Sequence, residues 1–396
     1  MPPEPVDLLI EARWVLPIAP VNTVFADHAV AVTSGRIVAL GPIAQMNARF
    51  EPVERVVRRD HALLPGFVNA HTRAAMTLLR GLRSQAAPSA SPDFVREGTQ
   101  LAIAEMLRAG ITSFADMYSF PAEVARAASA ARMRAAIGLP VADSASLWAE
   151  GATGHFEKAE QLWDEYQSDP WVCLYFAPHD AAEVSDPTLI RVRRVADELD
   201  ARVAMVAPPL ERMHGLGLLR PGFTAIGLQN ADSELIAATG ICVVANVQSD
   251  LRLGSRSLAV STLDSQHVTV AFGTGDPADV GALDILAEAR AAALIDNKLT
   301  AEDSLRIATL GGATALGFGA ITGSIEPGKY ADLLCIDLNR LACQPISRVP
   351  DAILFSATRE QASDVWTSGR AAVSNGRLLA FDEQELSAIA NRWSQT

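Results

Sequence analysis

From about residue 62 onward, short apolar runs alternate with segments whose apolar residues recur at helical spacing. This rhythm is typical of βα units arranged around a parallel sheet. The candidate strands span residues 63–69, 111–116, 134–141, 171–178, 202–207, 223–228, 241–245 and 268–273. The helical stretches include residues 94–108, 121–131, 187–199 and 301–316. We therefore expect an α/β fold, a (β/α)8 TIM-like barrel whose chemistry lies at the C-terminal ends of the strands.

Both ends of the chain carry a different pattern, in which short β-like runs are separated by turn-forming residues. Three runs precede the barrel, at residues 7–12, 29–32 and 36–40, and two follow it, at residues 330–338 and 364–372. Such runs are typical of a small antiparallel sheet. We expect residues 1–60 and 321–396 to form one small β-sandwich domain built from both termini, beside a barrel formed by residues 61–320.

Composition narrows the classes of partner. The chain has 396 residues, and 49% of them are hydrophobic, so it can bury a large core. Its 33 basic and 46 acidic residues give a formal charge of −13. A charge of this sign repels nucleic acid phosphates and anionic membrane surfaces. We expect a small-molecule ligand or another protein as the partner, and neither nucleic acid nor membrane.

The cysteines and the hydrophobic runs indicate a cytoplasmic protein. The chain has four cysteines: Cys173, Cys242, Cys335 and Cys343. No two of them form a Cys-x-x-Cys pair. Scattered cysteines in apolar surroundings are typical of reduced core residues. The N-terminus has no basic, apolar export signal, and no stretch approaches about 18 apolar residues.

Several short motifs resemble those of one enzyme family. They include Leu-Pro-Gly-Phe-Val-Asn-Ala-His at residues 64–71, Gly-Ile-Thr-Ser-Phe-Ala-Asp-Met-Tyr at 110–118, and Gly-Ser-Ile-Glu-Pro-Gly-Lys-Tyr-Ala-Asp-Leu at 323–333. With them, the chain resembles the amidohydrolase superfamily almost from end to end. The likeness is strongest to 5′-methylthioadenosine/S-adenosylhomocysteine deaminases and related chlorohydrolases. Such motifs establish common ancestry more firmly than they establish activity.

The resemblance implies a catalytic metal site that this sequence lacks in large part. The family holds a divalent cation with a His-x-His pair after strand one, a histidine after strand five and an aspartate after strand eight. His71 keeps the first ligand position, and His179 keeps a substrate-facing position after strand four. The remaining positions, including those of the proton-shuttling glutamate and histidine, carry Arg73, Val206, Pro209, Gly227 and Gly275.

These replacements predict that the family's zinc or other divalent metal is absent. A guanidinium offers no lone pair to a cation, and His71 alone supplies one of the four contacts that zinc needs. Two segments that cover the substrate in the family are also shortened here, at residues 84–92 and 211–217. We expect no cofactor and an open barrel mouth.

Arg73 has two interpretations. It can bind an anionic ligand, or it can form a salt bridge that replaces the metal, with Asp276, Asp279 or Asp116 as the partner. Asp276 lies one position after Gly275, and on a strand that shift turns the side chain to the opposite face. We therefore do not expect Asp276 to restore the metal site.

The candidate ligand-pocket residues are His71, Arg73, His179 and Asp276. If they do not contact a ligand, His71 is expected to be a retained scaffold residue and His179 is expected to be a polar residue of the barrel rim. The pair Asp284 and Glu288, one helical turn apart, is expected to face solvent. The other histidines show no ligand spacing and receive no role; they are His28, His61, His155, His214 and His267.

Three functions remain open. The first is a degenerate deaminase homologue without metal-dependent catalysis, which acts as a ligand-binding or regulatory protein, as a homo-oligomer or paired with an intact homologue. The alternative is a hydrolase of carbon–nitrogen bonds, of the adenosine-deaminase class, that is metal-independent or has a rebuilt site. The third is an ordinary metal-dependent deaminase, against which the ligand positions argue.

Overall fold

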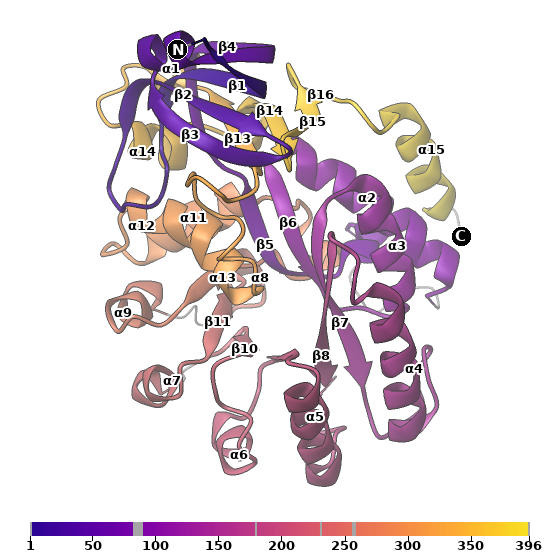
Figure 1. Ribbon diagram of the computed structural model, residues 1–396. Coiled ribbons are helices and arrows are strands. Elements are labelled where there is room, and N and C mark those ends of the chain that lie inside the picture. Colours follow the sequence, from indigo (N-terminus) through magenta and orange to yellow (C-terminus); the bar gives the residue numbers. More distant parts are fainter. Residues whose placement is uncertain (1, 82–89, 179, 230–231, 256–258, 395–396) are drawn as a thin grey trace.

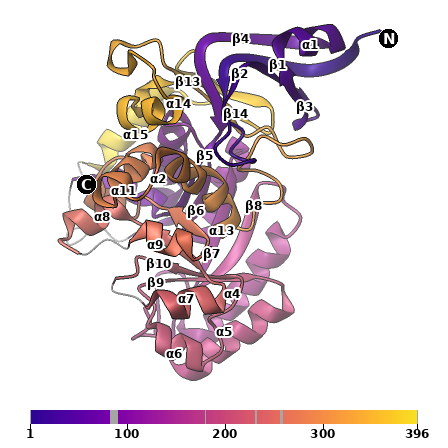
Figure 2. The same cartoon turned by 90° about the vertical axis from the view of Figure 1, so that its left-hand side faces the viewer.

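The computed structural model describes residues 2–81, 90–178, 180–229, 232–255 and 259–394. Within these ranges the strands form two eight-stranded sheets, with the terminal sheet stacked above the barrel (Figures 1 and 2). The expected (β/α)8 barrel with a separate sheet from both termini is thus confirmed. No helix of the described residues has the length and apolarity needed to cross a membrane.

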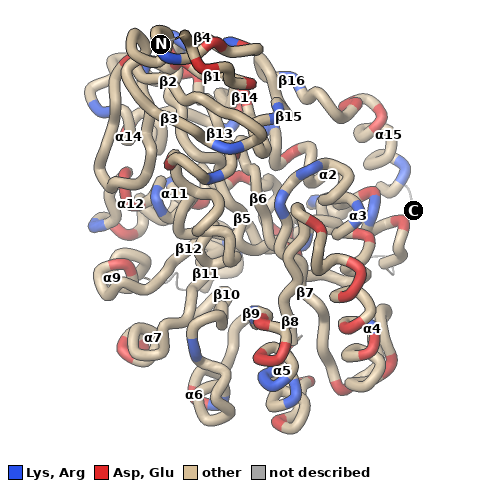
Figure 3. Tube along the Cα trace, viewed as in Figure 1, with Lys and Arg blue, Asp and Glu red and all other residues tan. Residues whose placement is uncertain are grey.

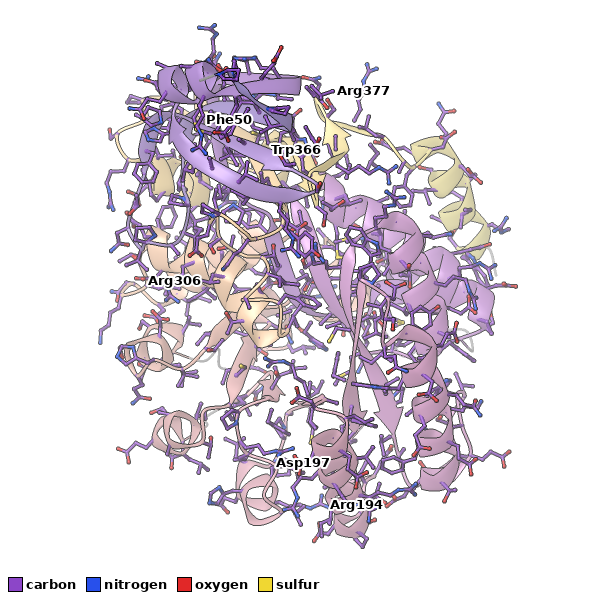
Figure 4. The ribbon with its side chains drawn as sticks, viewed as in Figure 1. Phe50, Arg194, Asp197, Arg306, Trp366 and Arg377 are labelled. Carbon is purple, nitrogen blue, oxygen red and sulfur yellow. The ribbon has the colours of Figure 1, made fainter. Side chains whose placement is uncertain are left out.

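The terminal sheet joins strands that lie more than 250 residues apart in the sequence. Its hydrogen-bonded order is β16-β15-β14-β13-β4-β1-β2-β3. The strands are β1 (Glu4–Val15), β2 (Phe25–Thr33), β3 (Arg36–Pro42), β4 (Phe50–Pro65), β13 (Leu333–Asp337), β14 (Ala362–Thr367), β15 (Arg370–Ser374) and β16 (Arg377–Leu378). Trp366, labelled in Figure 4, is 2% exposed and anchors the centre of this sheet.

The barrel sheet is parallel throughout, and its strands follow one another in sequence order. They are β5 (Phe67–Thr72), β6 (Ile111–Asp116), β7 (Arg134–Val141), β8 (Val172–Pro178), β9 (Arg202–Val206), β10 (Phe223–Ile226), β11 (Cys242–Ala245) and β12 (Val270–Phe272). A bridge between Thr72 and Gly275 connects the first strand to the segment after the last. All eight C-terminal strand ends therefore surround one mouth.

The predicted strand at residues 63–69 is in fact two strands in different sheets. Residues up to Pro65 belong to β4 of the terminal sheet, and β5 begins at Phe67. The break falls at Gly66, whose N–H donates to the Asp332 carbonyl at 2.9 Å. A Cβ atom at Gly66 would lie 2.2 Å from the Thr112 side chain, so a residue without a side chain is required at this crossing.

Helices cover the outside of the barrel and fill its loops (Figure 1). The α-helices are α1 (Ile43–Arg49), α2 (Pro92–Arg108), α3 (Pro121–Ala131), α4 (Gly151–Tyr166), α5 (Asp186–Glu198), α6 (Leu210–Gly215), α7 (Ser233–Thr239), α8 (Val247–Arg252), α9 (Val260–Ser265), α10 (Pro277–Val280), α11 (Ile285–Ile295), α12 (Ala301–Arg306), α13 (Gly312–Ala315), α14 (Val349–Asp351) and α15 (Glu383–Trp393). The predicted helix 301–316 is interrupted by a π-helical turn, Ile307–Gly311.

That π turn lies where the helix meets the barrel closely. A Cβ atom at Gly311 would lie 2.4 Å from the Val270 carbonyl of β12. Inside the barrel, small side chains such as Ala70, Ala115 and Ala136 form a compact core, whereas larger side chains fill the layer between strands and helices. The outer helices carry the charges, which are mostly acidic on α4 and mixed on α5 (Figure 3).

Candidate functional site

The first strand and the segment after the eighth lie side by side at the barrel mouth. The Gly275 N–H donates to the His71 carbonyl at 3.0 Å, and the Arg73 N–H donates to the Gly275 carbonyl at 3.3 Å. Two residues before His71 on β5, the Asn69 amide donates to the Thr274 hydroxyl at 2.8 Å. This ladder fixes the backbone that carries His71 and Arg73.

Arg73 and Asp276 form an ion pair at this mouth. Arg73 Nη1 lies 3.5 Å from Asp276 Oδ2, and the two side chains are 38% and 10% exposed. Asp276 Oδ1 accepts the Ala278 N–H at 2.9 Å and thereby caps α10. Burial raises the pKa of Asp276, while the Ala278 N–H and the Arg73 charge lower it. Asp276 is thus one of the three partners expected for Arg73.

The expectation that Asp276 faces away from the site was wrong. It assumed that the strand alternation continues through residue 276. Gly275 instead has a φ of +67°, in the left-handed region, and β12 ends at Phe272. The chain therefore leaves the strand before Asp276, and the carboxylate turns towards Arg73.

His71 is buried at the end of β5 and is held by an amide. Asn246 Nδ2 donates to His71 Nδ1 at 3.0 Å, so the neutral ring carries its proton on Nε2. Within the described ranges, His71 Nε2 has no hydrogen-bond partner. Burial, and then the Arg73 charge, lower the pKa of His71 to about 4. His71 is consequently uncharged at neutral pH.

Asp116 ends β6 and is 1% exposed. Its Oδ2 accepts the Ala74 N–H at 2.6 Å, and among the residues described here its Oδ1 has no partner. Burial raises the pKa of Asp116 to about 7, against the opposing effects of the Ala74 N–H and Arg73. This carboxyl group can therefore gain or lose a proton near neutral pH.

A cavity of about 500 Å³ lies beside Arg73. Its volume falls in the range of small-molecule pockets. Residues at the C-terminal ends of the strands and in the following loops line it; they are Arg73, Met117, Tyr118, Ser119, Gly138, Pro140, Ala142, Ser144, Ala145, Ser146, Leu147, Trp148, His155, Ala177, Asp180, Glu183, Val206 and Ala207. Arg73 is the candidate residue that reaches this wall directly.

One wall of the cavity is built by a hydrogen-bonded loop after β7. Ser146 Oγ lies 3.0 Å from His155 Nε2, and His155 Nδ1 lies 2.7 Å from the Gly151 carbonyl. Since a carbonyl only accepts, Nδ1 carries the proton and Nε2 accepts the Ser146 hydroxyl. His155, to which the sequence assigned no role, thus holds the loop that carries Trp148.

The other sequence candidates have separate places. Val206, at the end of β9, contributes an apolar side chain to the cavity wall. Pro209 precedes α6, and Gly227 follows β10. His179 and most of the shortened segment 84–92 lie outside the described residues, whereas residues 211–217 contain most of α6.

The expectation of solvent-facing Asp284 and Glu288 was wrong. Asp284 caps α11 by accepting the Ala287 N–H at 2.9 Å. Glu288 is 1% exposed, and both of its oxygens accept hydrogen bonds of 3.0 Å from Gln248. Burial raises the pKa of Glu288 to about 8, although the Gln248 hydrogen bonds oppose this. Glu288 therefore joins α11 to Gln248 of α8, whereas Asp284 caps α11 itself.

Comparison with known proteins decides the family. The amidohydrolase family matches residues 62–372. The chain belongs to this family. This amidohydrolase is 34% identical to a 5-methylthioadenosine/S-adenosylhomocysteine deaminase of Teredinibacter turnerae, over 98% of this chain and 97% of that one. It is 30% identical to a protein of the same name from Saccharophagus degradans, over 98% and 96%.

Solved structures agree with this family assignment. An adenosine deaminase from Xanthomonas campestris, with bound zinc, has a TM-score of 0.97 and 38% identity over 100% of this chain and 99% of that one. The zinc complex of the atrazine chlorohydrolase TrzN from Arthrobacter aurescens has a TM-score of 0.89 and 20% identity, over 98% and 99%. The second likeness concerns the fold alone.

The zinc in these relatives contradicts the sequence-based expectation that a metal cofactor is absent. That expectation compared only ligand positions, whereas a structure that matches this amidohydrolase over its whole length carries zinc. Two buried donor atoms of this chain without hydrogen-bond partners in the described ranges, His71 Nε2 and Asp116 Oδ1, are of the types that bind cations.

The described residues nevertheless offer fewer ligand atoms than a zinc site needs. In the described part of the chain, no group of three or more His, Cys, Asp or Glu side chains is placed to hold a metal ion. His71 Nδ1 accepts the Asn246 amide, so the ring proton lies on Nε2 and must leave before Nε2 can donate to a metal. The described residues therefore do not make a complete metal site.

Sequence reasoning missed Asn246, considered Asp116 only as a partner of Arg73, and placed Glu288 in solvent. Asp116 and Asn246 are polar residues that end or directly follow barrel strands, which is the signal that could have identified them. Glu288 gave a weaker signal, since a charged residue on a helix usually faces solvent. Only its contact with Gln248 reveals its burial.

Proposed function

We propose that this amidohydrolase is a hydrolase of the deaminase class, which cleaves a carbon–nitrogen bond of a small molecule bound in the barrel-mouth cavity. The relatives named as deaminases support this reaction class, because the similarity spans the barrel and the terminal sheet alike. They support it better than the inactive binding or regulatory protein considered from the sequence.

The observation that carries the proposal is the set of groups gathered around Arg73. Burial lowers the pKa of His71 and the charge of this guanidinium lowers it further, whereas burial raises the pKa of Asp116, Tyr118 and Asp276 and the same charge opposes that rise. These residues come from the ends of the first, second and eighth strands, where barrel enzymes place their chemistry. These polar groups therefore surround the Arg73 guanidinium, which is a permanent cation.

Arg73, Asp116, His71 and Asp276 have different roles in the proposed reaction. Arg73 lines the cavity, where its N–H donors would bind and orient a negatively charged or polar group of the substrate. Asp116 is buried at the end of β6, where burial raises its pKa to about 7, so it can exchange a proton near neutral pH. His71 and Asp276 are positioning residues, which fix the backbone and the guanidinium.

The test is ammonia release from 5′-methylthioadenosine, S-adenosylhomocysteine and adenosine by the purified full chain, with and without added zinc. Metal content is measured on the same samples. We expect turnover that falls at least tenfold in R73M, whereas R340M, which removes an exposed arginine of the terminal region, retains it. Absence of ammonia from every substrate under both conditions would reject the hydrolase and leave the binding protein.

A further inference from the structure

We infer that Arg73 is a carboxylate-binding residue and that the cavity takes a singly charged anionic ligand. This inference rests on the proposed function in one respect, since it favours, among the substrates tested there, the one that carries a carboxylate, S-adenosylhomocysteine. Arg73 lines that cavity with a side chain that is 38% exposed. A guanidinium offers five N–H donors in a planar fork that matches a carboxylate.

The pairing of Arg73 with Asp276 leaves most of those donors available. The ion pair is a contact of 3.5 Å, whereas charge-assisted N–H···O bonds are about 2.7–2.9 Å long. Asp276 Oδ1 is engaged by the Ala278 N–H, which holds the carboxylate as the cap of α10. A carboxylate held by this cap stays at 3.5 Å from Arg73 and makes no short hydrogen bond to it.

Arginines that hold this fold together are paired differently. Arg58 donates to both oxygens of Asp364 at 2.6 Å, and Arg134 donates to Asp332 at 2.8 Å with both side chains buried. Arg73 has the longer contact and the greater exposure. Its geometry is therefore that of a cation presented to a ligand, and not that of a buried structural pair.

The charges of the cavity wall select the kind of anion. Among the described lining residues, Arg73 is the one lysine or arginine, and the loop after β8 contributes two acidic residues, Asp180 and Glu183. These two acidic residues repel a doubly charged phosphate more strongly than a singly charged carboxylate. The acidic residues repel the anionic end of the ligand, which orients it towards Arg73.

The experiment compares benzoate with benzamide, its neutral isostere, by calorimetric titration of the full-length protein. The tryptophan fluorescence of the protein, to which Trp148 in the cavity wall contributes, is a second readout. Wild type is expected to bind benzoate at least about tenfold more tightly than benzamide. R73M should lose this preference, and R340M should retain it. Inorganic phosphate is titrated as well, and tighter binding of phosphate than of benzoate would overturn the carboxylate assignment.

D276N separates a ligand-binding arginine from a structural one. Asparagine can still cap α10, but it removes the negative charge beside Arg73, so benzoate affinity should rise. A purely structural arginine would show unchanged or weaker benzoate binding in D276N. Equal binding of benzoate and benzamide by wild type, or no benzoate binding, would reject the inference even if R73M did not fold. Because binding is measured without turnover, failure of the hydrolase proposal would be recognised separately.

Discussion

The Arg73 guanidinium lies 3.5 Å from the Asp276 carboxylate, beside the Thr72–Gly275 bridge that closes the barrel. Asp276 has two tasks there, because its other oxygen caps α10. The ion pair and the cap can be separated by substitution. The cap needs only an oxygen atom that accepts a hydrogen bond. The ion pair needs a negative charge.

We expect D276A to lower the free energy of unfolding by about 0.5–2 kcal/mol through loss of the cap. D276N should lose less, since asparagine also caps helices well. Urea denaturation of both variants and wild type measures the difference. Equal losses in the two variants would show that the cap contributes nothing.

Asn246 is expected to decide which nitrogen of His71 carries the proton. In N246D the carboxylate should accept from Nδ1–H, which moves the proton from Nε2 to Nδ1. N246A should instead destabilise the protein by about 1–3 kcal/mol, because the buried Nδ1 loses its partner. Nitrogen-15 NMR of the imidazole distinguishes the tautomers, and an unchanged His71 spectrum in N246D would contradict this assignment.

Glu288 is expected to make stability fall as pH rises. Its pKa of about 8 in the folded protein exceeds the ordinary value of 4.5, so the folded state binds more protons between these values. The contribution is present below about pH 4.5 and is lost as pH rises through about 8, at up to about 1.4 kcal/mol per pH unit. E288Q should flatten this part of the curve. Parallel urea curves for wild type and E288Q between about pH 5 and 8 would show that Glu288 does not titrate as described.

Gly66 is expected to tolerate no side chain at the crossing between the two sheets. In G66A the new Cβ would meet the Thr112 side chain at 2.2 Å, and overpacking of this kind costs about 1–3 kcal/mol or more. G215A is the matched control, since no atom lies within 4 Å of its Cβ position. Thermal unfolding should place G66A well below wild type and G215A close to it, and the opposite order would refute the explanation.

Much of the fold could be predicted because its signals are local. Apolar runs separated by helical stretches marked all eight barrel strands, and the break at Gly66 was missed because apolar residues continue on both sides of it. The π turn at Ile307–Gly311 was missed for a related reason. It follows from a close contact with β12, which no helical periodicity reports.

The barrel, the sheet shared by both termini and the arginine at a family ligand position can all be read from the amino-acid sequence. Three features emerge only once the chain is folded: Gly275 turns Asp276 towards Arg73, Asn246 holds His71 from 175 positions away, and Glu288 is buried. The physical reason is the range of the interactions. Periodicity reflects neighbours within a few residues, whereas burial and pKa depend on groups that meet only when distant strands close into a barrel.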